Sequence, residues 1–178
     1  MSVERPLSSE PDLIAGLRAG DEDAAHEFFD RYAARIRRFI ANSLGAEVAE
    51  ADDLLQETFI ALADALPFFR GDSSLFTFAC AIAHRKVLSY VRINARRARL
   101  IRTAPTAEHD DSREPGANPE FNRALAVLRP DYREMLILKY VEEISVSEIA
   151  RILRLGEHAV ESRLARARKA LRKSLEEV

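Results

Sequence analysis

Large hydrophobic residues recur every three or four positions along most of the chain, which is the spacing of an amphipathic helix with one buried face. The spacing runs through residues 25–40, 51–66 and 75–91 of the N-terminal half, and through 121–128, 130–140, 149–153 and 160–175 of the C-terminal half. No segment of any length alternates polar and apolar residues as a half-buried β-strand does, and no internal repeat is present. The pattern therefore predicts an all-α fold.

Residues that favour helix ends lie between the segments with helical spacing. Pro67 is expected to end the second helix, and Ser73 or Ser74 to cap the third. Ser145 is followed three residues later by Glu148, which is the pattern of a capping box at the start of a short helix. These signals place helix starts and stops where the hydrophobic spacing changes.

The end of the C-terminal half combines this short capped helix, a brief turn at residues 154–156 and a longer basic helix. The combination predicts a helix-turn-helix, whose second helix enters the major groove of DNA. The alternative is a plain helical hairpin with a charged exterior. The cap, the turn length and the charge together favour the helix-turn-helix.

Residues 103–119 contain three prolines, one glycine and no large apolar side chain, which is the composition of a linker. This segment divides the chain into an N-terminal domain of residues 1–102 and a C-terminal domain of residues 120–178, both within the size range of small domains. We therefore expect two small helical domains joined by a flexible linker, each able to fold alone.

The formal net charge of −2 hides an uneven distribution. Residues 39–69 contain six acidic and no basic residues, whereas residues 85–102 and 162–175 contain seven and six basic residues and no acidic one. A single run of like charges is usually a solvated helix face, but two basic runs on predicted helices favour contact with phosphates. The acidic run suits a basic protein partner and would be repelled by DNA.

Several kinds of chemistry are missing from the sequence. The single cysteine, Cys80, rules out an internal disulfide and is typical of a reducing compartment, so we expect a cytoplasmic protein. Its apolar surroundings favour a small core residue over a redox sensor. We find no glycine-rich phosphate loop, no nucleophile–base set and no metal-ligand cluster, and we predict no catalytic residue, no cofactor, no metal and no enzyme activity. No apolar run is long enough for membrane insertion.

Three blocks of residues, in order along the chain, carry a resemblance to a known family. Residues 51–59, Ala-Asp-Asp-Leu-Leu-Gln-Glu-Thr-Phe, resemble the Ala-Glu-Asp-Leu-Val-Gln-Glu-Val-Phe signature of extracytoplasmic-function (ECF) sigma factors, group 4 of the sigma-70 family. Residues 69–73, Thr77-Phe78, Ile82-Ala83 and Arg92 resemble the family's next block, and residues 128–130, 133, 148–150, 160, 162–164 and 166–168 resemble its promoter-reading domain. The resemblance covers residues 10–102 and 120–178.

The resemblance implies a protein that binds core RNA polymerase, directs it to specific promoters and assists DNA strand opening. Its implied partners are the β′ clamp helices and the β subunit of the polymerase, promoter DNA and an anti-sigma factor. The residues implied at the polymerase are Asp52, Asp53, Gln56 and Glu57. The alternative is that these acids only stabilise a helix N-terminus, but Gln56 and Glu57 lie beyond its first turn, which favours docking.

Implied DNA-binding residues form two groups. Those for the minus-ten element are Phe68, Arg70, Asp72 and Ser73, with Arg85, Lys86, Arg92, Arg96 and Arg97 on the basic helix behind them; those for the minus-thirty-five element are His158, Glu161, Ser162, Arg163, Arg166 and Lys169. Residues 68–74 would capture an extruded base by stacking and hydrogen bonding. The alternative for Phe68 and Phe69 is a place in the core, which we favour for Phe69.

Five residues depart from the family pattern: Phe78 replaces the usual Trp, Arg85 an Asn, Arg154 a turn Gly, Ala159 a Thr and Glu161 a Lys. Phe78 should keep the core role, whereas Arg85 argues against a direct base contact at that position. Glu161 has two alternatives: it accepts a hydrogen bond from a cytosine amino group, or it pairs with Arg154 or Arg168 on the surface.

Two other classes of protein fit parts of the sequence. A stand-alone helix-turn-helix regulator would need a receiver domain or a ligand pocket in the N-terminal half, which shows no β-α-β pattern. A helical enzyme would need a catalytic set, which we do not find. Co-purification with core polymerase would separate the sigma factor from both.

Overall fold

The computed structural model describes residues 9–44, 48–101, 123–125 and 127–176, and within these ranges the fold is helical with no strand. The elements are α1 (Glu10–Ala19), α2 (Glu22–Leu44), α3 (Val48–Ala65), the 3-10 turn η1 (Leu66–Phe68), α4 (Leu75–Ile101), α6 (Pro130–Leu136), the π-helical turn η2 (Ile137–Val141), α7 (Val146–Leu153) and α8 (Glu157–Glu176). The all-α prediction is confirmed. The predicted linker, residues 103–119, lies outside the described residues.

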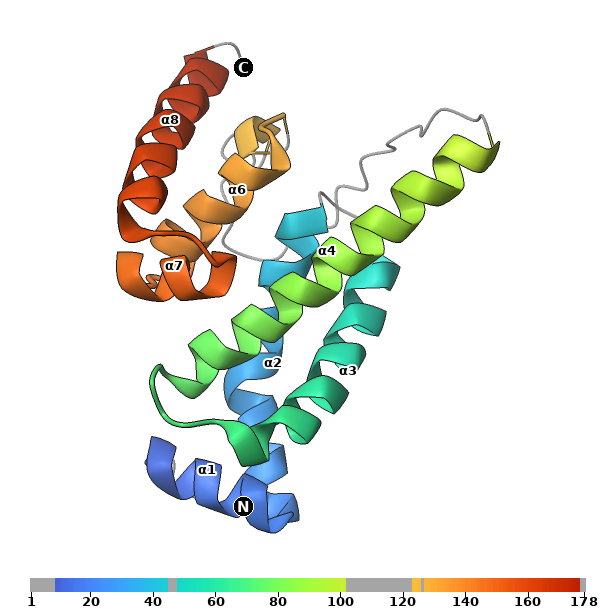
Figure 1. The fold of residues 1–178 in the computed structure, drawn as a ribbon, viewed down its shortest axis with the longest axis vertical. Coiled ribbons are helices and arrows are strands. Elements are labelled where there is room, and N and C mark those ends of the chain that lie inside the picture. Colours follow the sequence, from blue (N-terminus) through green and yellow to red (C-terminus); the bar gives the residue numbers. More distant parts are fainter. Residues whose placement is uncertain (1–8, 45–47, 102–122, 126, 177–178) are drawn as a thin grey trace, which may run out of the picture.

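Helices α2, α3 and α4 pack together in the N-terminal half, and α1 lies across one end of them (Figure 1). The predicted apolar face of α2 is the centre of this core, where Ile36, Phe39 and Ile40 are fully buried. Helix α1 was not predicted from hydrophobic spacing. Its N-cap is Ser9, and Gly20 ends it in the left-handed conformation that glycine adopts without a Cβ clash.

The start of α4 is held by two side chains from different parts of the chain. Ser74 Oγ accepts a hydrogen bond from Thr77 N at 3.1 Å, so Ser74 rather than Ser73 caps the helix. Leu75 N donates to Glu10 Oε1 of α1, also at 3.1 Å. Two free backbone donors of the helix are thereby satisfied, and α1 fixes where α4 begins.

In the C-terminal half, α6 and α8 pack around a small cluster formed by Leu125, Leu128, Leu136 and Ala167. Arg133 lies within it and is itself buried. Its guanidinium donates to the carbonyl oxygens of Leu125 at 2.9 Å and Leu128 at 3.1 Å, which ties α6 to the preceding segment. Burial lowers the pKa of Arg133, and the carbonyl acceptors offset part of the cost of burying the charge.

Helices α7 and α8 form the predicted helix-turn-helix. Ser145 and Glu148 make the predicted capping box at the start of α7. The helix ends at Arg154, which has a φ of 53° where glycine would be unstrained. Leu155 and Gly156 complete the turn before α8 begins. Arg154 therefore adopts the left-handed conformation at the turn position where the family usually has glycine.

The two halves lie against each other along α4 and α2. Helix α7 packs on α4, and α6 and η2 pack on α2 (Figure 1). One hydrophobic core is continuous across the contact, because Ile149, Val160 and Leu164 belong to the same cluster as Phe39 and Ala83. Nothing in the sequence pattern indicated this contact. Whether each half folds alone stays a prediction.

Candidate functional site

The four residues predicted to bind polymerase lie on the exposed side of α3. Asp52, Asp53, Gln56 and Glu57 are all exposed, whereas Leu54, Leu55 and Thr58 on the opposite side are buried. The helix period therefore presents them as one surface.

Two of these acids are partly neutralised by bases from neighbouring helices. Arg37 of α2 forms an ion pair with Asp52, and its hydrogen bond holds the pKa of Asp52 below the ordinary value. Lys86 Nζ of α4 lies 3.1 Å from Glu57 Oε2. Among the described residues, Asp53 and Gln56 have no hydrogen-bond or ion-pair partner. These two polar groups are the most available to a partner protein.

The segment between α3 and α4 holds two adjacent phenylalanines in opposite environments. Phe69 is buried, and its ring centroid lies 4.6 Å from that of Phe78. Phe68 is 82% exposed. The core role predicted for Phe69 and for Phe78 is confirmed, and the ring of Phe68 is left in solvent.

The backbone around Phe68 is fixed from α1. Arg18 donates from Nε to the carbonyl oxygen of Leu66 at 3.2 Å and from Nη2 to that of Phe69. Beyond it, Gly71 adopts a φ of 78° and turns the chain toward Ser74. Arg70 and Asp72 are exposed, and the Ser73 hydroxyl donates to the Ser74 carbonyl oxygen at 3.3 Å. The loop is therefore anchored at both ends with its polar side chains at the surface.

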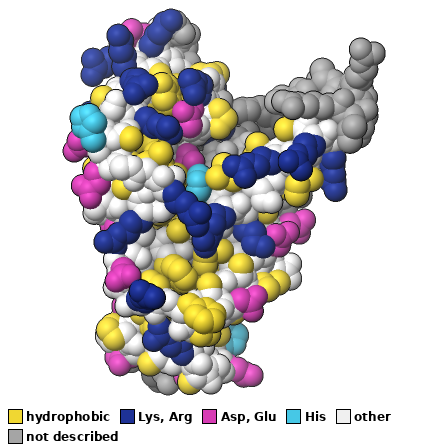
Figure 2. Space-filling model, viewed as in Figure 1, with side chains coloured by type: hydrophobic (Ala, Val, Ile, Leu, Met, Phe, Trp, Pro, Cys, Tyr) yellow, Lys and Arg dark blue, Asp and Glu magenta, His cyan; other side chains and the backbone are white. Residues whose placement is uncertain are grey.

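The basic residues of α4 follow the loop along an arm that projects from the bundle, where Figure 2 shows a row of Lys and Arg side chains. Arg85, Arg92, Arg96 and Arg97 are exposed, and Lys86 is half-buried beside Glu57. The arm also carries the exposed apolar residues Val91 and Ile93. The loop exposes one base, Arg70, and the arm exposes several, and between them residues 75–84 of α4 are buried or half-buried.

Helix α8 buries Val160, Leu164 and Ala167 and turns its predicted DNA-binding residues outward. His158, Glu161, Arg166 and Lys169 are exposed, and Ser162 and Arg163 are half-buried. Arg166 Nη2 donates to Ser162 Oγ at 2.9 Å, one turn earlier on the helix. Among the described side chains, no ion pair joins Glu161 to Arg154 or Arg168. The exposed face of α8 is thus basic with one acidic flank.

Cys80 is fully buried in the middle of α4. Burial, together with the nearby charge of Glu142, raises the pKa of its thiol well above the usual range. A neutral, inaccessible thiol is inert toward oxidants, so its predicted core role is confirmed.

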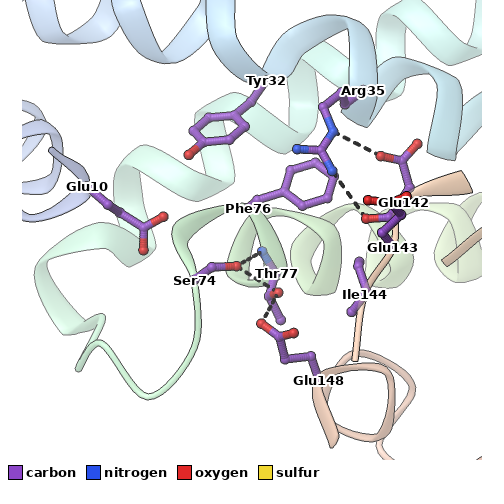
Figure 3. Close-up of a pocket in the computed structure, with 10 residues that line it drawn as sticks. All are labelled: Glu10, Tyr32, Arg35, Ser74, Phe76, Thr77, Glu142, Glu143, Ile144 and Glu148. Atoms are coloured by element: carbon purple, nitrogen blue, oxygen red, sulfur yellow. Dashed lines mark hydrogen bonds and ion pairs between the residues drawn. The ribbon is translucent and has the colours of Figure 1, made fainter. Parts of the chain in front are cut away.

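Sequence reasoning missed a polar cluster at the contact between the halves. Glu142 is only 3% exposed and accepts hydrogen bonds from Arg35 and Arg38 of α2. A pocket of about 260 Å³ opens beside it, lined among others by Tyr32, Phe76 and Glu148 of α7 (Figure 3). No local pattern marks a pair more than 100 residues apart, and the sequence shows only that Glu142 follows an apolar run.

Comparison with known proteins agrees with this geometry. Family models match twice: sigma-70 region 2 at residues 28–97 and sigma-70 region 4 at residues 120–171. The chain is 30% identical over 166 residues to the RNA polymerase sigma factor CarQ of Myxococcus xanthus, covering 91% of this chain and 95% of CarQ. It is 33% identical over 164 residues to the ECF RNA polymerase sigma factor SigC of Mycobacterium tuberculosis, covering 89% and 87%.

Two solved structures are similar in fold. CnrH in complex with the cytosolic domain of CnrY matches with a TM-score of 0.70 and 26% identity over 95% of this chain and 98% of CnrH. The sigma factor RpoE of Bartonella quintana, in complex with the anti-sigma factor NepR, matches with a TM-score of 0.76 and 24% identity, covering 87% and 98%. Among the described residues, no helix is long and apolar enough to span a membrane.

The chain therefore belongs to the ECF RNA polymerase sigma factors, within the sigma-70 family. It acts in promoter-specific initiation of transcription, with core RNA polymerase and promoter DNA as its partners.

Proposed function

We propose that this sigma factor works through three separate surfaces: the acidic side of α3 on core polymerase, the loop of residues 68–74 with the arm of α4 on the minus-ten element, and the outer face of α8 on the minus-thirty-five element. The observation that carries the assignment is that most of the predicted binding residues on these elements are exposed, while buried apolar side chains such as Leu54, Phe69 and Val160 lie behind them.

At the polymerase, Asp53 and Gln56 meet the β′ clamp helices. A carboxylate without an internal partner attracts a basic surface and steers its approach. The amide of Gln56, one turn of helix away, supplies both a donor and an acceptor. The C-terminal half contacts the β subunit, so that both halves are held on the enzyme.

At the minus-ten element, the loop binds a base that is no longer paired. Phe68 has its ring in solvent and stacks on a base that has left the duplex, while Asp72, Ser73 and Arg70 bond its edge. The arginines of α4 hold the phosphates of the adjoining duplex. Binding energy for the unstacked base then drives strand opening, with no catalytic step.

At the minus-thirty-five element, the N-terminal part of α8 enters the major groove. Arg163 and Arg166 contact a guanine edge or a phosphate, and Lys169 contacts the backbone. Ser162 positions Arg166 through the hydrogen bond between their side chains. Glu161 lies on the flank, where a carboxylate accepts a hydrogen bond from a cytosine amino group.

A protein inhibitor is the remaining proposed partner. CnrH, 26% identical to this chain, has been solved in complex with the cytosolic domain of CnrY. We expect this chain to be held inactive in the cytoplasm by a comparable anti-sigma factor.

Co-purification with core polymerase tests the proposal. Tagged wild-type protein should retain core polymerase, and the Asp53→Lys variant should retain much less. The matched control is Asp64→Lys, which makes the same charge change at another exposed acid of α3. If both variants retained the same amount of core polymerase, the docking assignment would be refuted. If the wild type retained none, the proposed function would be refuted.

A further inference from the structure

Helix α1 lies against η1 and contacts both ends of the loop proposed to bind the minus-ten element (Figure 1). Arg18, in its last turn, donates from Nε to the carbonyl oxygen of Leu66 at 3.2 Å and from Nη2 to that of Phe69. Glu10, in its first turn, accepts from Leu75 N at 3.1 Å. One end of α1 therefore holds the start of the loop, and the other end holds the start of α4.

The charges of these two side chains match the helix ends that they meet. Carbonyl oxygens at the C-terminal end of a helix carry partial negative charge, and amide groups at the N-terminal end carry partial positive charge. Arg18 meets the end of α3 and η1, and Glu10 meets the beginning of α4. Glu10 and Arg18 lie eight positions apart on one helix, which fixes their spacing along its axis at about 12 Å.

Helix α1 is itself packed closely on the bundle. Leu13 is 1% exposed, and a Cβ added at Gly16 would lie 2.7 Å from that of Ala24 on α2. Ser9 caps the start of the helix, and Gly20 ends it in the left-handed conformation. A helix packed this closely gives the loop a fixed support.

Phe68 lies between the two residues whose carbonyl groups Arg18 binds, and its ring is 82% exposed. Pro67 before it has a fixed φ and no N–H to donate, and Phe69 after it is buried against Phe78. A guanidinium is a planar fork that can bond two carbonyl groups at once. Arg18 therefore defines the backbone that carries the Phe68 ring, while the ring itself stays in solvent.

We propose that Arg18 is a positioning residue for strand opening, which holds the turn at residues 66–69 in the shape that receives an extruded base. The proposal rests on the minus-ten function of the loop given above. A binding loop that is ordered in advance loses less conformational freedom when it binds, so its affinity is higher. Arg18 acts through Phe68 and does not itself touch DNA, and Glu10 supports the other end of the loop.

Amide hydrogen exchange in the free chain tests the support itself. Phe69 N donates to the Leu66 carbonyl oxygen at 3.1 Å, so its exchange rate reports the turn. Arg18→Gln should speed exchange at Phe69 about tenfold and leave the amides of α2 unchanged. Arg18 is exposed, so the change leaves no cavity in the core. The matched control is Arg31→Gln, the same change at a residue that pairs with Glu27 on α2, and it should leave Phe69 unchanged.

An unchanged rate at Phe69 in Arg18→Gln, or equal acceleration throughout α2, would overturn a local positioning role. Glu10→Ala is a second variant with its own probe, the Leu75 amide, whose exchange should be faster because its acceptor is lost. An unaffected Leu75 amide would overturn the part assigned to Glu10.

Binding of a single-stranded oligonucleotide by the holoenzyme tests what the support is for. The oligonucleotide carries the minus-ten element of a promoter selected with wild-type holoenzyme. Arg18→Gln should weaken binding about tenfold in the wild-type background and have little further effect in Phe68→Ala, because Arg18 acts through that ring. Losses that add in the double variant would overturn this coupling.

Two further measurements separate positioning from a direct phosphate contact. Arg18→Lys keeps the charge but not the planar fork, so it should bind the oligonucleotide nearly as weakly as Arg18→Gln. The dependence of log affinity on log salt should be the same in both variants and the wild type, because no phosphate contact is lost. Full recovery with lysine, or a slope that is shallower by about one in Arg18→Gln, would overturn the proposal.

Failure of the proposed function would give a different result. All variants should bind core polymerase as the wild type does, because Arg18 lies on α1 and the proposed docking residues lie on α3. If wild-type holoenzyme did not bind the oligonucleotide, the minus-ten role of the loop would be refuted. The exchange rate of the Phe69 amide would still decide whether Arg18 holds the turn.

Discussion

Lys86 Nζ and Glu57 Oε2 lie 3.1 Å apart, so a base proposed to contact DNA and an acid proposed to contact polymerase pair with each other in the free chain. Glu57 is more than half exposed, and such a surface pair contributes about 1 kcal/mol or less. Binding either partner therefore releases the other residue at small cost. The pair links the two surfaces physically without blocking either one.

Asp53→Lys should weaken binding to core polymerase about tenfold, because it reverses a carboxylate that has no internal partner among the described residues. Gln56→Ala should produce a smaller loss. Fluorescence anisotropy of labelled sigma factor titrated with core polymerase measures both, with Asp64→Lys as the control. Helicity should be unchanged, and an Asp64→Lys loss as large as that of Asp53→Lys would show that only net charge matters.

Phe68→Ala and Phe69→Ala should affect different properties, the first strand opening and the second stability. Phe69 is buried against Phe78, so its truncation should cost about 3–5 kcal/mol of unfolding free energy. Phe68 is in solvent, so its truncation should leave the melting temperature unchanged but reduce open-complex formation. Thermal melts and permanganate footprinting measure the two effects.

The Phe68→Ala defect should be relieved on a template whose minus-ten region is already unpaired, because part of the stacking energy is spent on separating the strands. If normal permanganate reactivity persists on duplex promoters with Phe68→Ala, the exposed ring has no role in opening.

Arg166→Ala should lower affinity for promoter DNA. If the contact is to a phosphate, the dependence of log affinity on log salt should become shallower by about one. Arg172→Ala, near the other end of α8, is the matched control and should change affinity less. Titrations at several salt concentrations give the slope. Identical slopes for all three proteins would place the Arg166 contact on a base edge, and identical affinities would remove it from the interface.

Glu148 should make the contact between the halves sensitive to acid. Burial works against ionisation, but hydrogen bonds from Ser145 and Thr77 outweigh it and hold the pKa of Glu148 below its ordinary 4.5. A lowered folded-state pKa means that the stabilisation is complete above the ordinary value and is lost as pH falls through the folded value. Glu148→Gln keeps the hydrogen-bonding shape without the titration.

The melting temperature of the wild type should therefore exceed that of Glu148→Gln by a constant amount above pH 5, and the difference should shrink at lower pH. A melting-temperature difference that grows as pH falls would contradict the inference that the ionised form of Glu148 stabilises the fold.

Local features were predictable from the sequence because they depend on neighbours along the chain. The helix faces of α2 and α8, the capping box of Ser145 and Glu148, and the core role of Phe69 follow from spacing and side-chain chemistry. Helix α1 escaped prediction because one buried leucine, Leu13, gives little periodic signal.

The pairing of Glu142 with Arg35 and Arg38 was not predictable for a different reason. It joins positions more than 100 residues apart, and no local preference encodes which distant helix a buried carboxylate will meet. The roles of individual residues at polymerase and DNA stay predictions, because a structure of the free chain contains neither partner.

The central claim is that this chain gives core polymerase promoter specificity. Its most direct test is transcription by the reconstituted holoenzyme on fragmented genomic DNA from the source organism, with the 5′ ends of the RNA mapped. The account predicts discrete start sites that share sequence elements near minus-ten and minus-thirty-five and that are absent with core polymerase alone. A distribution of 5′ ends indistinguishable from that of core polymerase alone would contradict it.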